Sequence, residues 1–399
     1  MRTSAAVFTA AGIATVALLC ACSNGASQGS SSMLPSYGGS QRGMMTRPNL
    51  LSDAAVEFAY EANEGSTNVS GYKIETTGAL TPLKGSPFAA GTAPSGVAID
   101  PLGKFADVSN AGSGNVSAFT INATSGALTQ VKGSPYDSGV QSAGVAVDPT
   151  GKFAYVANAG TSSVSSVSAY TIKSTDALTQ LKGSPFGAGS GAEYIAVDSS
   201  GKFVYVPNAG SNNVSAYKIG GSGALTPVKG SPFGAGSEAF GIAVDPSAKF
   251  AYVSNYGSNN VSAYAINASS GALTPIQGSP FGAGTGPCAV TVDTGGKFAY
   301  VANNGSANIS AYTIKSDGTL TPVKGSPFAA GAGPCYGAVD PSDKFLYIGN
   351  SGDNTISAYK IGSSGALTPL KGSPFPAGTT PAVIATCWVT AGKCIPPKL

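Results

Sequence analysis

Short apolar runs alternate with turn-forming residues along most of the chain, and their spacing does not suit helices. The stretch Gly201–Phe233 and the residues just after it show the pattern best, because each run is β-branched or aromatic and is bounded by Asn, Gly or Ser. Runs of this length without apolar spacing of three or four predict β-strands. The predicted strands are 203–207, 214–219, 224–229 and 241–244. Residues 208–213, Asn-Ala-Gly-Ser-Asn-Asn, predict a hairpin between the first two strands.

The same unit recurs along the chain, marked by the tetrad Gly-Ser-Pro-Phe, in which Tyr136 replaces Phe once. The copies lie 47 to 50 residues apart and begin at Gly85, Gly133, Gly183, Gly230, Gly278, Gly325 and Gly372. A period of this length with four strands and no helix is typical of a β-propeller blade. A parallel β-helix would need a much shorter period, and a row of sandwich domains about twice the period.

The two ends of the array complement each other. The first recognisable strand, 58–62, corresponds to the second strand of a unit, and the segment 381–386 corresponds to a first strand. Joining them completes one blade and removes the exposed edges of an open array. The sequence therefore predicts an all-β, seven-bladed β-propeller with four antiparallel strands per blade over residues 54–394, followed by a short tail, 395–399.

The strand motif carries a family resemblance. The run Tyr300-Val301-Ala302-Asn303, followed by an Asn-x-Ser-Ala-Tyr strand, recurs about every 48 residues. In this respect the chain resembles the YVTN-type seven-bladed β-propellers, and from about Ala54 to Lys393 it resembles their lactonase-like branch, often compared with 6-phosphogluconolactonase. The resemblance implies the propeller fold and suggests lactone hydrolysis. Its motifs are strand and turn residues, so they carry little information on chemistry.

The first 53 residues have a different character. Arg2 and the apolar run 10–19 precede Leu19-Cys20-Ala21-Cys22, which resembles a bacterial lipobox. We expect residues 1–22 to be a lipoprotein signal peptide with lipidation at Cys22, and residues 23–53 to be a flexible tether. Ordinary signal cleavage and a chance apolar start are the alternatives. The expected location is the bacterial cell envelope, with Ser23 favouring the outer membrane, as a monomer that contacts the membrane only through its lipid.

Composition narrows the chemistry. Charged residues make up 10% of the chain, and a net charge of +3 predicts no attraction to nucleic acid. The chain has no His, and its only Arg residues, Arg2, Arg42 and Arg47, precede the repeats. Mechanisms that need His are therefore excluded, and so is recognition of phosphate by Arg within the repeats. We predict neither a cofactor nor a metal site.

Four cysteines remain after signal processing. They are Cys288, Cys335, Cys387 and Cys394, and three connectivities are possible in an oxidising compartment. Cys288 and Cys335 occupy equivalent positions of neighbouring units, and Cys387 and Cys394 flank a short turn. Two local disulfides are the simplest pairing.

One aspartate recurs at an equivalent turn in six units: Asp100, Asp148, Asp198, Asp245, Asp293 and Asp340. A functional ring of carboxylates is one interpretation. We favour the other, in which each carboxylate accepts backbone N–H groups of the turn that follows it.

The units differ most just before the fourth run. One position reads Ser95, Ala143, Glu193, Phe240, Cys288, Cys335 and Ala382, and the next reads Gly96, Gly144, Tyr194, Gly241, Ala289, Tyr336 and Val383. In a propeller this run lines the central channel, so these side chains should surround one mouth, on the face where the hairpins carry Glu64, Tyr256 and Asp353. The candidate ligand site comprises Glu193, Tyr194, Glu238, Phe240, Tyr336, Glu64 and Tyr256. Neutral variation on an exposed rim is the alternative.

Two further carboxylates fall inside strands. Glu61 replaces the usual Val (compare Val156), and Asp107 replaces the usual Tyr (compare Tyr155). Because their positions are offset by one residue in adjacent blades, they point to opposite faces of their sheets. In half of the possible arrangements they would meet between blades 1 and 2, sharing a proton or holding a cation.

Two classes of function remain. We favour a non-catalytic propeller that binds a small ligand or an envelope protein, or acts as a scaffold. The alternative is a lactone hydrolase that uses a carboxylate base, such as Glu193 or Glu238, with assistance from Lys. The sequence leaves open whether the protein is an enzyme.

Overall fold

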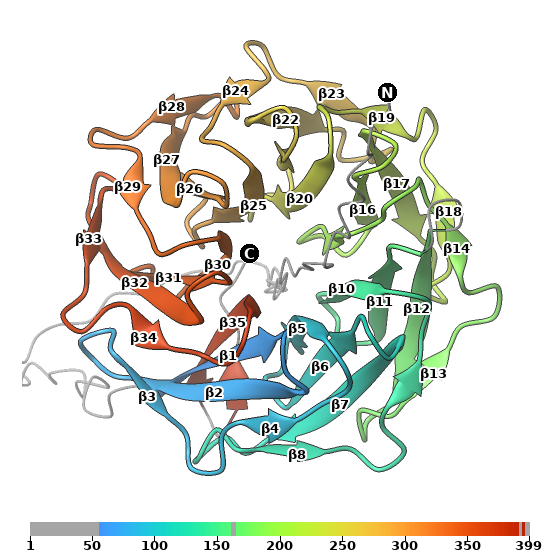
Figure 1. The fold of residues 1–399 in the computed structure, drawn as a ribbon. Coiled ribbons are helices and arrows are strands. Elements are labelled where there is room, and N and C mark those ends of the chain that lie inside the picture. The colour runs from blue at the N-terminus through green and yellow to red at the C-terminus, as the bar shows by residue number, and fades with distance from the viewer. Residues whose placement is uncertain (1–55, 161–164, 391–392, 396–399) are drawn as a thin grey trace, which may run out of the picture.

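The computed structural model describes residues 56–160, 165–390 and 393–395, without the side chains of 390 and 393–395. The predicted signal peptide, Cys22 and the tether lie outside these residues. Within them, seven sheets surround a common axis (Figure 1). No helix in the described part of the chain is long and apolar enough to cross a membrane.

The blades are numbered along the chain, and blade 1 takes strands from both ends. Blade 1 consists of β1 (Glu57–Asn63), β2 (Asn68–Ile74), β3 (Leu80–Pro82), β4 (Phe88–Ala89), β35 (Pro381–Thr390) and β36 (Lys393–Ile395). Blade 2 consists of β5 (Pro94–Ile99), β6 (Phe105–Asn110), β7 (Asn115–Ile121), β8 (Leu128–Gln130) and β9 (Tyr136–Asp137). Blade 3 consists of β10 (Ser142–Val147), β11 (Phe153–Asn158), β12 (Ser166–Ile172), β13 (Leu178–Gln180) and β14 (Phe186–Gly187). Blade 4 consists of β15 (Ala196–Val197), β16 (Phe203–Asn208), β17 (Asn213–Ile219), β18 (Leu225–Pro227) and β19 (Phe233–Gly234).

The last three blades repeat this order. Blade 5 consists of β20 (Ala239–Val244), β21 (Phe250–Asn255), β22 (Asn260–Ile266), β23 (Leu273–Pro275) and β24 (Phe281–Gly282). Blade 6 consists of β25 (Pro287–Val292), β26 (Phe298–Asn303), β27 (Asn308–Ile314), β28 (Leu320–Pro322) and β29 (Phe328–Ala329). Blade 7 consists of β30 (Pro334–Val339), β31 (Phe345–Asn350), β32 (Thr355–Ile361), β33 (Leu367–Pro369) and β34 (Phe375–Pro376).

Blades 2 to 7 follow the predicted path of four antiparallel strands from the axis outward, and in blade 1 the same path of β35, β1, β2 and β3 is extended by β36, which pairs with the other edge of β35. The inner strands, of which β5 is typical, contact one another around the ring. The third strand is shorter than expected because the chain turns after it, and the tetrad forms a further two-residue strand. In blade 4, the hydroxyl of Ser231 in this tetrad accepts the Ala216 N–H at 2.9 Å, which ties the turn to the sheet.

The two ends of the chain close the ring. Strand β35 pairs antiparallel with β1, with Phe58 opposite Cys387 and Tyr60 opposite Ala385. The blade shared by both ends is visible in Figure 1, where β35 lies beside β1. The predicted closure is therefore confirmed, and with it the seven-bladed fold.

A tyrosine hydrogen bond recurs between neighbouring blades. In six of the seven interfaces a buried Tyr hydroxyl donates to a Gly carbonyl of the next blade at 2.8 to 3.2 Å. The pairs are Tyr60–Gly126, Tyr155–Gly223, Tyr205–Gly271, Tyr252–Gly318, Tyr300–Gly365 and Tyr347–Gly78. Glycine is needed there because φ is positive and a Cβ at Gly126 would lie 2.7 Å from the Phe58 ring.

The six recurring aspartates are structural, as favoured from the sequence. In blade 5, the Oδ1 atom of Asp245 accepts the Lys249 N–H at 2.7 Å and the Phe250 N–H at 2.6 Å. The same two bonds occur at Asp100, Asp148, Asp198, Asp293 and Asp340. These carboxylates therefore hold the turns at the end of the ring opposite the hairpins.

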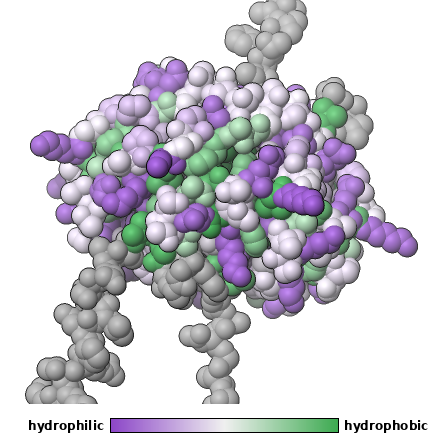
Figure 2. Space-filling model, turned by 90° about the horizontal axis from the view of Figure 1, so that it is seen from below, coloured by the Kyte–Doolittle hydropathy of each residue, from purple (hydrophilic) through white to green (hydrophobic). Residues whose placement is uncertain are grey.

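On the outer wall of the ring, hydrophilic side chains project between narrow apolar strips (Figure 2).

Candidate functional site

The hairpins and the beginnings of the inner strands share one end of the ring axis, which we call the mouth. In each blade the hairpin after the second strand from the axis bonds to the loop that leads into the innermost strand. In blade 1, Glu64 N–H donates to the Thr380 carbonyl at 2.9 Å, and in blade 5, Tyr256 N–H donates to the Glu238 carbonyl at 2.9 Å. The predicted meeting of the hairpins with the variable positions is therefore confirmed.

Bulges in the inner strands allow two successive side chains to face the axis. The register of β20 against β21 shifts between Ala239 and Ile242, which brackets Phe240. In blade 4 the disruption is larger, because β15 contains only Ala196–Val197 and the bridge Ala192–Asn208 stands apart from it. Residues 193–195 leave the ladder between these points. A bulge re-aims side chains in this way, and it brings both Glu193 and Tyr194 to the mouth.

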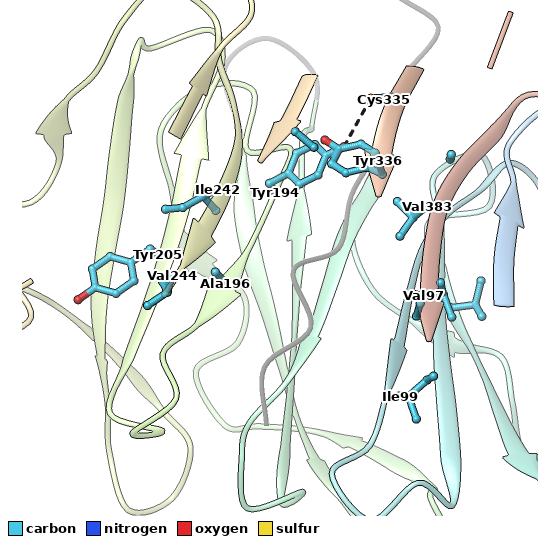
Figure 3. Close-up of a cluster of buried hydrophobic side chains, with 14 of the residues drawn as sticks. Val97, Ile99, Tyr194, Ala196, Tyr205, Ile242, Val244, Cys335, Tyr336 and Val383 are labelled. Atoms are coloured by element: carbon cyan, nitrogen blue, oxygen red, sulfur yellow. Dashed lines mark hydrogen bonds between the residues drawn. The ribbon is translucent and has the colours of Figure 1, made fainter. Parts of the chain in front are cut away.

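Four aromatic side chains form a continuous cluster at the mouth. The Tyr194 ring stacks on Tyr336 of blade 7, with ring centroids 4.1 Å apart and planes at 29°. Phe240 lies 5.2 Å from Tyr194, and Tyr256 lies 5.9 Å from Phe240. Tyr194 and Tyr336 are buried, whereas Phe240 and Tyr256 are partly exposed. Figure 3 shows Tyr336, on β30, and Tyr194, in the segment just before β15, extending toward each other. Such pairs add about 0.5–1.5 kcal/mol each beyond area burial.

Small residues between blades 4 and 7 make this stacking possible. Gly241 and Ala289 occupy the position of Tyr194 in the two intervening blades. A Cβ at Gly241 would lie 2.6 Å from the Cys288 carbonyl oxygen, so a larger residue would push these strands apart. The two tyrosines therefore meet because their neighbours in the ring are small.

A disulfide lies beside the aromatic cluster. Cys288 and Cys335 are bonded, with Cα atoms 5.0 Å apart, as predicted. The Tyr194 hydroxyl lies 4.0 Å from the Cys335 sulfur, and the bond joins the inner strands of blades 6 and 7. The disulfide thus holds the strand that carries Tyr336. Cys387 is also disulfide-bonded. The Cys394 side chain lies outside the description, so its predicted pairing with Cys387 stays a prediction.

Two glutamates at the mouth interact electrostatically although they come from blades 1 and 4. Burial, with a smaller contribution from the charge of Glu193, raises the pKa of Glu64 to about 8. Burial raises the pKa of Glu193 to about 7. The Gly144 N–H donates to the Glu193 carbonyl at 2.9 Å, which fixes the backbone of Glu193 against blade 3. Carboxyl groups that titrate near neutrality can accept and donate protons at physiological pH.

The remaining acidic residues at the mouth have other surroundings. Glu238 is exposed, adopts a positive φ of 52° and donates its N–H to the Asn212 side chain at 2.8 Å. Asp353 accepts the Ala332 N–H at 2.5 Å and so ties its hairpin to the loop that leads into β30. Of the seven predicted site residues, the structure thus joins the four aromatics in one cluster and Glu64 with Glu193 in a pair, and leaves Glu238 on the outer rim.

Of the two arrangements left open for Glu61 and Asp107, the one in which they meet is wrong. Glu61 is fully buried against blade 7, where a Cβ on Gly349 would lie 2.8 Å from its Oε1 atom. Asp107 instead faces blade 3, where its charge raises the pKa of Asp176. The alternation of side chains along a strand therefore points the two residues away from the interface between blades 1 and 2.

The sequence analysis missed Asp176. This residue occupies the turn position at which the other six blades have the glycine that accepts the tyrosine hydroxyl. The signal was present in the comparison of the repeats, because a positive-φ glycine had been replaced by an acidic residue. In the part of the chain that the structure describes, no group of three or more Asp, Glu, Cys or His side chains is arranged to hold a metal ion.

A separate cleft lies between blades 5 and 6, at the end of the ring opposite the mouth. It encloses about 440 Å³ and is lined by Asp245, Lys249, Lys315 and neighbouring turn residues. The Asp245 carboxylate is already engaged by backbone N–H groups, so it is not available as a base. The mouth, by contrast, has two carboxyl groups with pKa values close to neutrality, those of Glu64 and Glu193.

Comparison with known proteins agrees with this architecture. The family model described as "Lactonase, 7-bladed beta-propeller" matches residues 46–141, 144–333 and 284–381. The chain belongs to this lactonase family. The family resemblance seen in the sequence is thereby confirmed. No curated protein matches the sequence.

Several solved structures share the lactonase-family fold. The periplasmic gluconolactonase of Pseudomonas aeruginosa is 16% identical, with a TM-score of 0.73 over 84% of this chain and 100% of that one. A Bacteroides fragilis protein, provisionally assigned as a 6-phosphogluconolactonase, is 20% identical, with a TM-score of 0.71 over 84% and 99%. A Bacteroides uniformis protein with the same provisional assignment is 20% identical, with a TM-score of 0.70 over 83% and 99%. At these identities the likeness shows a common fold.

Proposed function

We propose that this lactonase-family propeller hydrolyses uncharged sugar lactones at its mouth. The observation that carries the proposal is the pair Glu64 and Glu193, whose pKa values of about 8 and about 7 lie close to neutral pH, next to an aromatic cluster. The sequence alone favoured a non-catalytic module. The carboxyl pair changes this preference, because two groups with separated pKa values near neutrality suit general acid–base catalysis.

The two glutamates have complementary roles in the proposed reaction. Glu193, with the lower pKa, takes a proton from water while the water oxygen attacks the lactone carbonyl carbon. The ring C–O bond then breaks, and the leaving oxygen takes the proton of Glu64, which is protonated at neutral pH. Proton transfer from Glu193 to Glu64, directly or through water, restores the starting state, so one water is consumed for each lactone opened.

The aromatic cluster supplies the surface for the sugar ring. Phe240 and Tyr256 are partly exposed and can contact a ligand, while the buried Tyr194–Tyr336 stack supports Phe240 from behind. Sites for small ligands combine aromatic walls with a few polar groups that fix orientation. The mouth has this combination in Phe240, Tyr256 and the two glutamates.

The charge of the mouth favours a neutral substrate. Its ionisable carboxyl groups are Glu64, Glu193, Glu238 and Asp353, and the repeats contain neither Arg nor His. A phosphate or carboxylate on the substrate would meet like charges, which costs binding energy and gives discrimination. We therefore expect gluconolactone to be preferred over its 6-phosphate.

The test is hydrolysis of δ-gluconolactone by the purified protein, measured above the spontaneous rate. We expect Glu193→Gln to lower kcat/KM by about 100-fold or more, because general-base catalysis contributes that much. Glu238→Gln, which changes the same residue type on the rim, is the matched control and should retain full activity. Turnover that is equal in wild type and Glu193→Gln would refute the proposed base.

Binding without turnover is the second candidate function. It is favoured by the lack of Arg and His in the repeats, since hydrolysis needs a group that stabilises the oxyanion. Calorimetric binding of a sugar or lactone without hydrolysis, lost in Phe240→Ala, would support this role.

We further propose that the protein acts in the cell envelope, where a lipid on Cys22 holds it at the membrane. The substitution Cys22→Ala should then abolish incorporation of labelled fatty acid.

A further inference from the structure

One of the seven blade interfaces differs from the others. At six interfaces a Tyr hydroxyl donates to a Gly carbonyl, as for Tyr155 and Gly223 at 2.9 Å. Between blades 2 and 3 the tyrosine position holds Asp107 and the glycine position holds Asp176. At this interface carboxylic acids therefore occupy both positions of the recurring Tyr–Gly pair.

These two carboxyl groups are buried, and three of their four oxygen atoms have no hydrogen-bond donor. The exposed fraction is 2% for Asp107 and 0% for Asp176. The Oδ1 atom of Asp107 and both carboxyl oxygens of Asp176 have no hydrogen-bond partner. An uncompensated buried carboxylate is strongly destabilising, so a positive charge or a proton has to be present at this interface.

The two groups lie within electrostatic reach of each other, and the other carboxyl group that acts on both, Asp100, is also acidic. Burial raises the pKa of Asp176, and the charges of Asp107 and Asp100 raise it further. Burial and the charge of Asp100 likewise raise the pKa of Asp107. Asp100 differs from these two residues because its carboxylate is already hydrogen-bonded. Its Oδ1 atom accepts the Lys104 and Phe105 N–H groups. The phenols of Tyr136 and Tyr170 lie within electrostatic reach of Asp107 and carry no positive charge.

The exchange also changes the space at the interface. Replacing Tyr by Asp removes most of a phenol ring, and replacing Gly by Asp returns part of that volume. The difference is about 30 Å³, roughly the volume of one water molecule in the liquid. The carbonyl group that accepts the tyrosine hydroxyl elsewhere belongs here to Asp176, at the same turn position.

We propose that Asp107 and Asp176 bind one divalent cation between blades 2 and 3. Two carboxylates neutralise a divalent ion, and an all-oxygen set suits a hard cation such as Ca²⁺. Among the described residues, no third acidic side chain joins these two in a set that could hold a metal ion. The main-chain carbonyl of Asp176 and water therefore supply the remaining ligands. Mg²⁺ is less suitable because it demands near-ideal octahedral geometry and retains several of its waters, whereas Ca²⁺ accepts bidentate carboxylates in a flexible arrangement. The ion replaces the Tyr–Gly hydrogen bond as the link between these blades.

The probe is Ca²⁺ added to the full, chelator-treated protein. We expect saturable 1:1 binding by calorimetry and a rise in Tm of about 3 °C or more at a hundredfold excess over Kd. Tb³⁺, which takes the same oxygen ligands, should luminesce on excitation of tyrosine, because Tyr136 and Tyr170 lie close to Asp107. Ca²⁺ should displace Tb³⁺ and quench this signal.

The ring supplies a matched control. The double variant Asp107→Tyr with Asp176→Gly restores the residues of the other six interfaces, so it should fold and should lose both the Ca²⁺-dependent Tm shift and the Tb³⁺ signal. Asp107→Asn with Asp176→Asn removes the charges at nearly constant volume and should lose both responses as well. The proposal is overturned if wild type shows no response to Ca²⁺, or if the restored variant responds equally. Stabilisation of wild type by acid alone, without any effect of Ca²⁺, would show that the pair shares a proton instead.

Discussion

The turn aspartates and the mouth glutamates lie at opposite ends of the same ring, and they use the same chemical group differently. At the turn of blade 4, Asp198 accepts the N–H groups of Lys202 and Phe203 at 2.8 and 2.7 Å. At the mouth, the Oε2 atom of Glu64 has no hydrogen-bond donor, and the charge of Glu193 acts on it. The turn carboxylates have their lone pairs engaged by the backbone, whereas Glu64 keeps one free.

The presence or absence of backbone N–H donors distinguishes structural carboxylates from candidate catalytic ones better than their frequency in the repeats does. Backbone N–H groups favour the ionised form of an aspartate and hold it in place. A carboxyl group that is desolvated without such donors is held closer to the neutral form, and it can exchange protons at neutral pH. The carboxylates that recur in the repeats therefore stabilise the fold, whereas the candidate site is formed by carboxyl groups that occur in single blades.

The largest expected effect is on rate. Glu193→Gln should lower kcat/KM for δ-gluconolactone by about 100-fold to 10⁴-fold, because it removes the base without changing shape. The variant should be at least as stable as wild type in thermal unfolding, because Gln is neutral and burial disfavours the charged form of Glu193. A variant that loses activity only in proportion to lost folded protein would place Glu193 among the structural carboxylates.

The opposite result is expected at the turns. Asp198→Ala should lower the free energy of unfolding by about 3 kcal/mol, because two charge-assisted hydrogen bonds to buried backbone are lost. Activity per folded molecule should be unchanged. Urea unfolding measures the first quantity, and kcat corrected for the folded fraction measures the second. A specific loss of kcat would break the distinction between the two groups.

Glu61 tests a carboxyl group that is buried and serves no turn. Burial raises its pKa well above 4.5, so its contribution to stability is full below the unfolded pKa of about 4.3 and is lost as pH rises. Glu61→Val introduces the residue that five of the other six blades have at this position, Ile348 being the exception, and should stabilise the protein at pH 8 by about 1–3 kcal/mol. The gain should shrink toward pH 4. A gain independent of pH would show that packing, and not ionisation, accounts for it.

The smallest effect is a change in the shape of the pH profile. Wild-type kcat/KM should rise through pH of about 7 as Glu193 loses its proton and fall above about 8 as Glu64 loses its proton. In Glu64→Gln the decline above pH 8 should disappear, with a reduced rate at the plateau. A decline that persists in this variant would assign the acid to another group.

The sequence predicted the strands and the ring closure well, because both depend on local signals. Turn residues such as 208–213 mark the hairpins, and the unpaired first and last strands define the joint between β1 and β35. It also singled out Glu193, Tyr194 and Tyr336 as candidates, because they are large residues at positions where most other units have small ones. These predictions required only that equivalent residues occupy equivalent places in the ring.

What the sequence could not supply was contact across the axis and the direction in which side chains point. The stacking of Tyr194 on Tyr336 depends on small residues in blades 5 and 6 and on the bulge at 193–195. The pairing of Glu64 with Glu193 joins blades 1 and 4, which are not adjacent in the ring, so the order of the repeats does not predict it. The error over Asp107 had the same origin, since a strand pattern gives alternation but not which neighbouring blade each face meets.

The most direct test is the structure of the protein with δ-gluconolactam, a lactone analogue that resists hydrolysis. The account predicts that its ring packs on Phe240 and Tyr256, with the carbonyl group next to Glu193 at the mouth. Binding in the cleft between blades 5 and 6, or anywhere away from these residues, would contradict it.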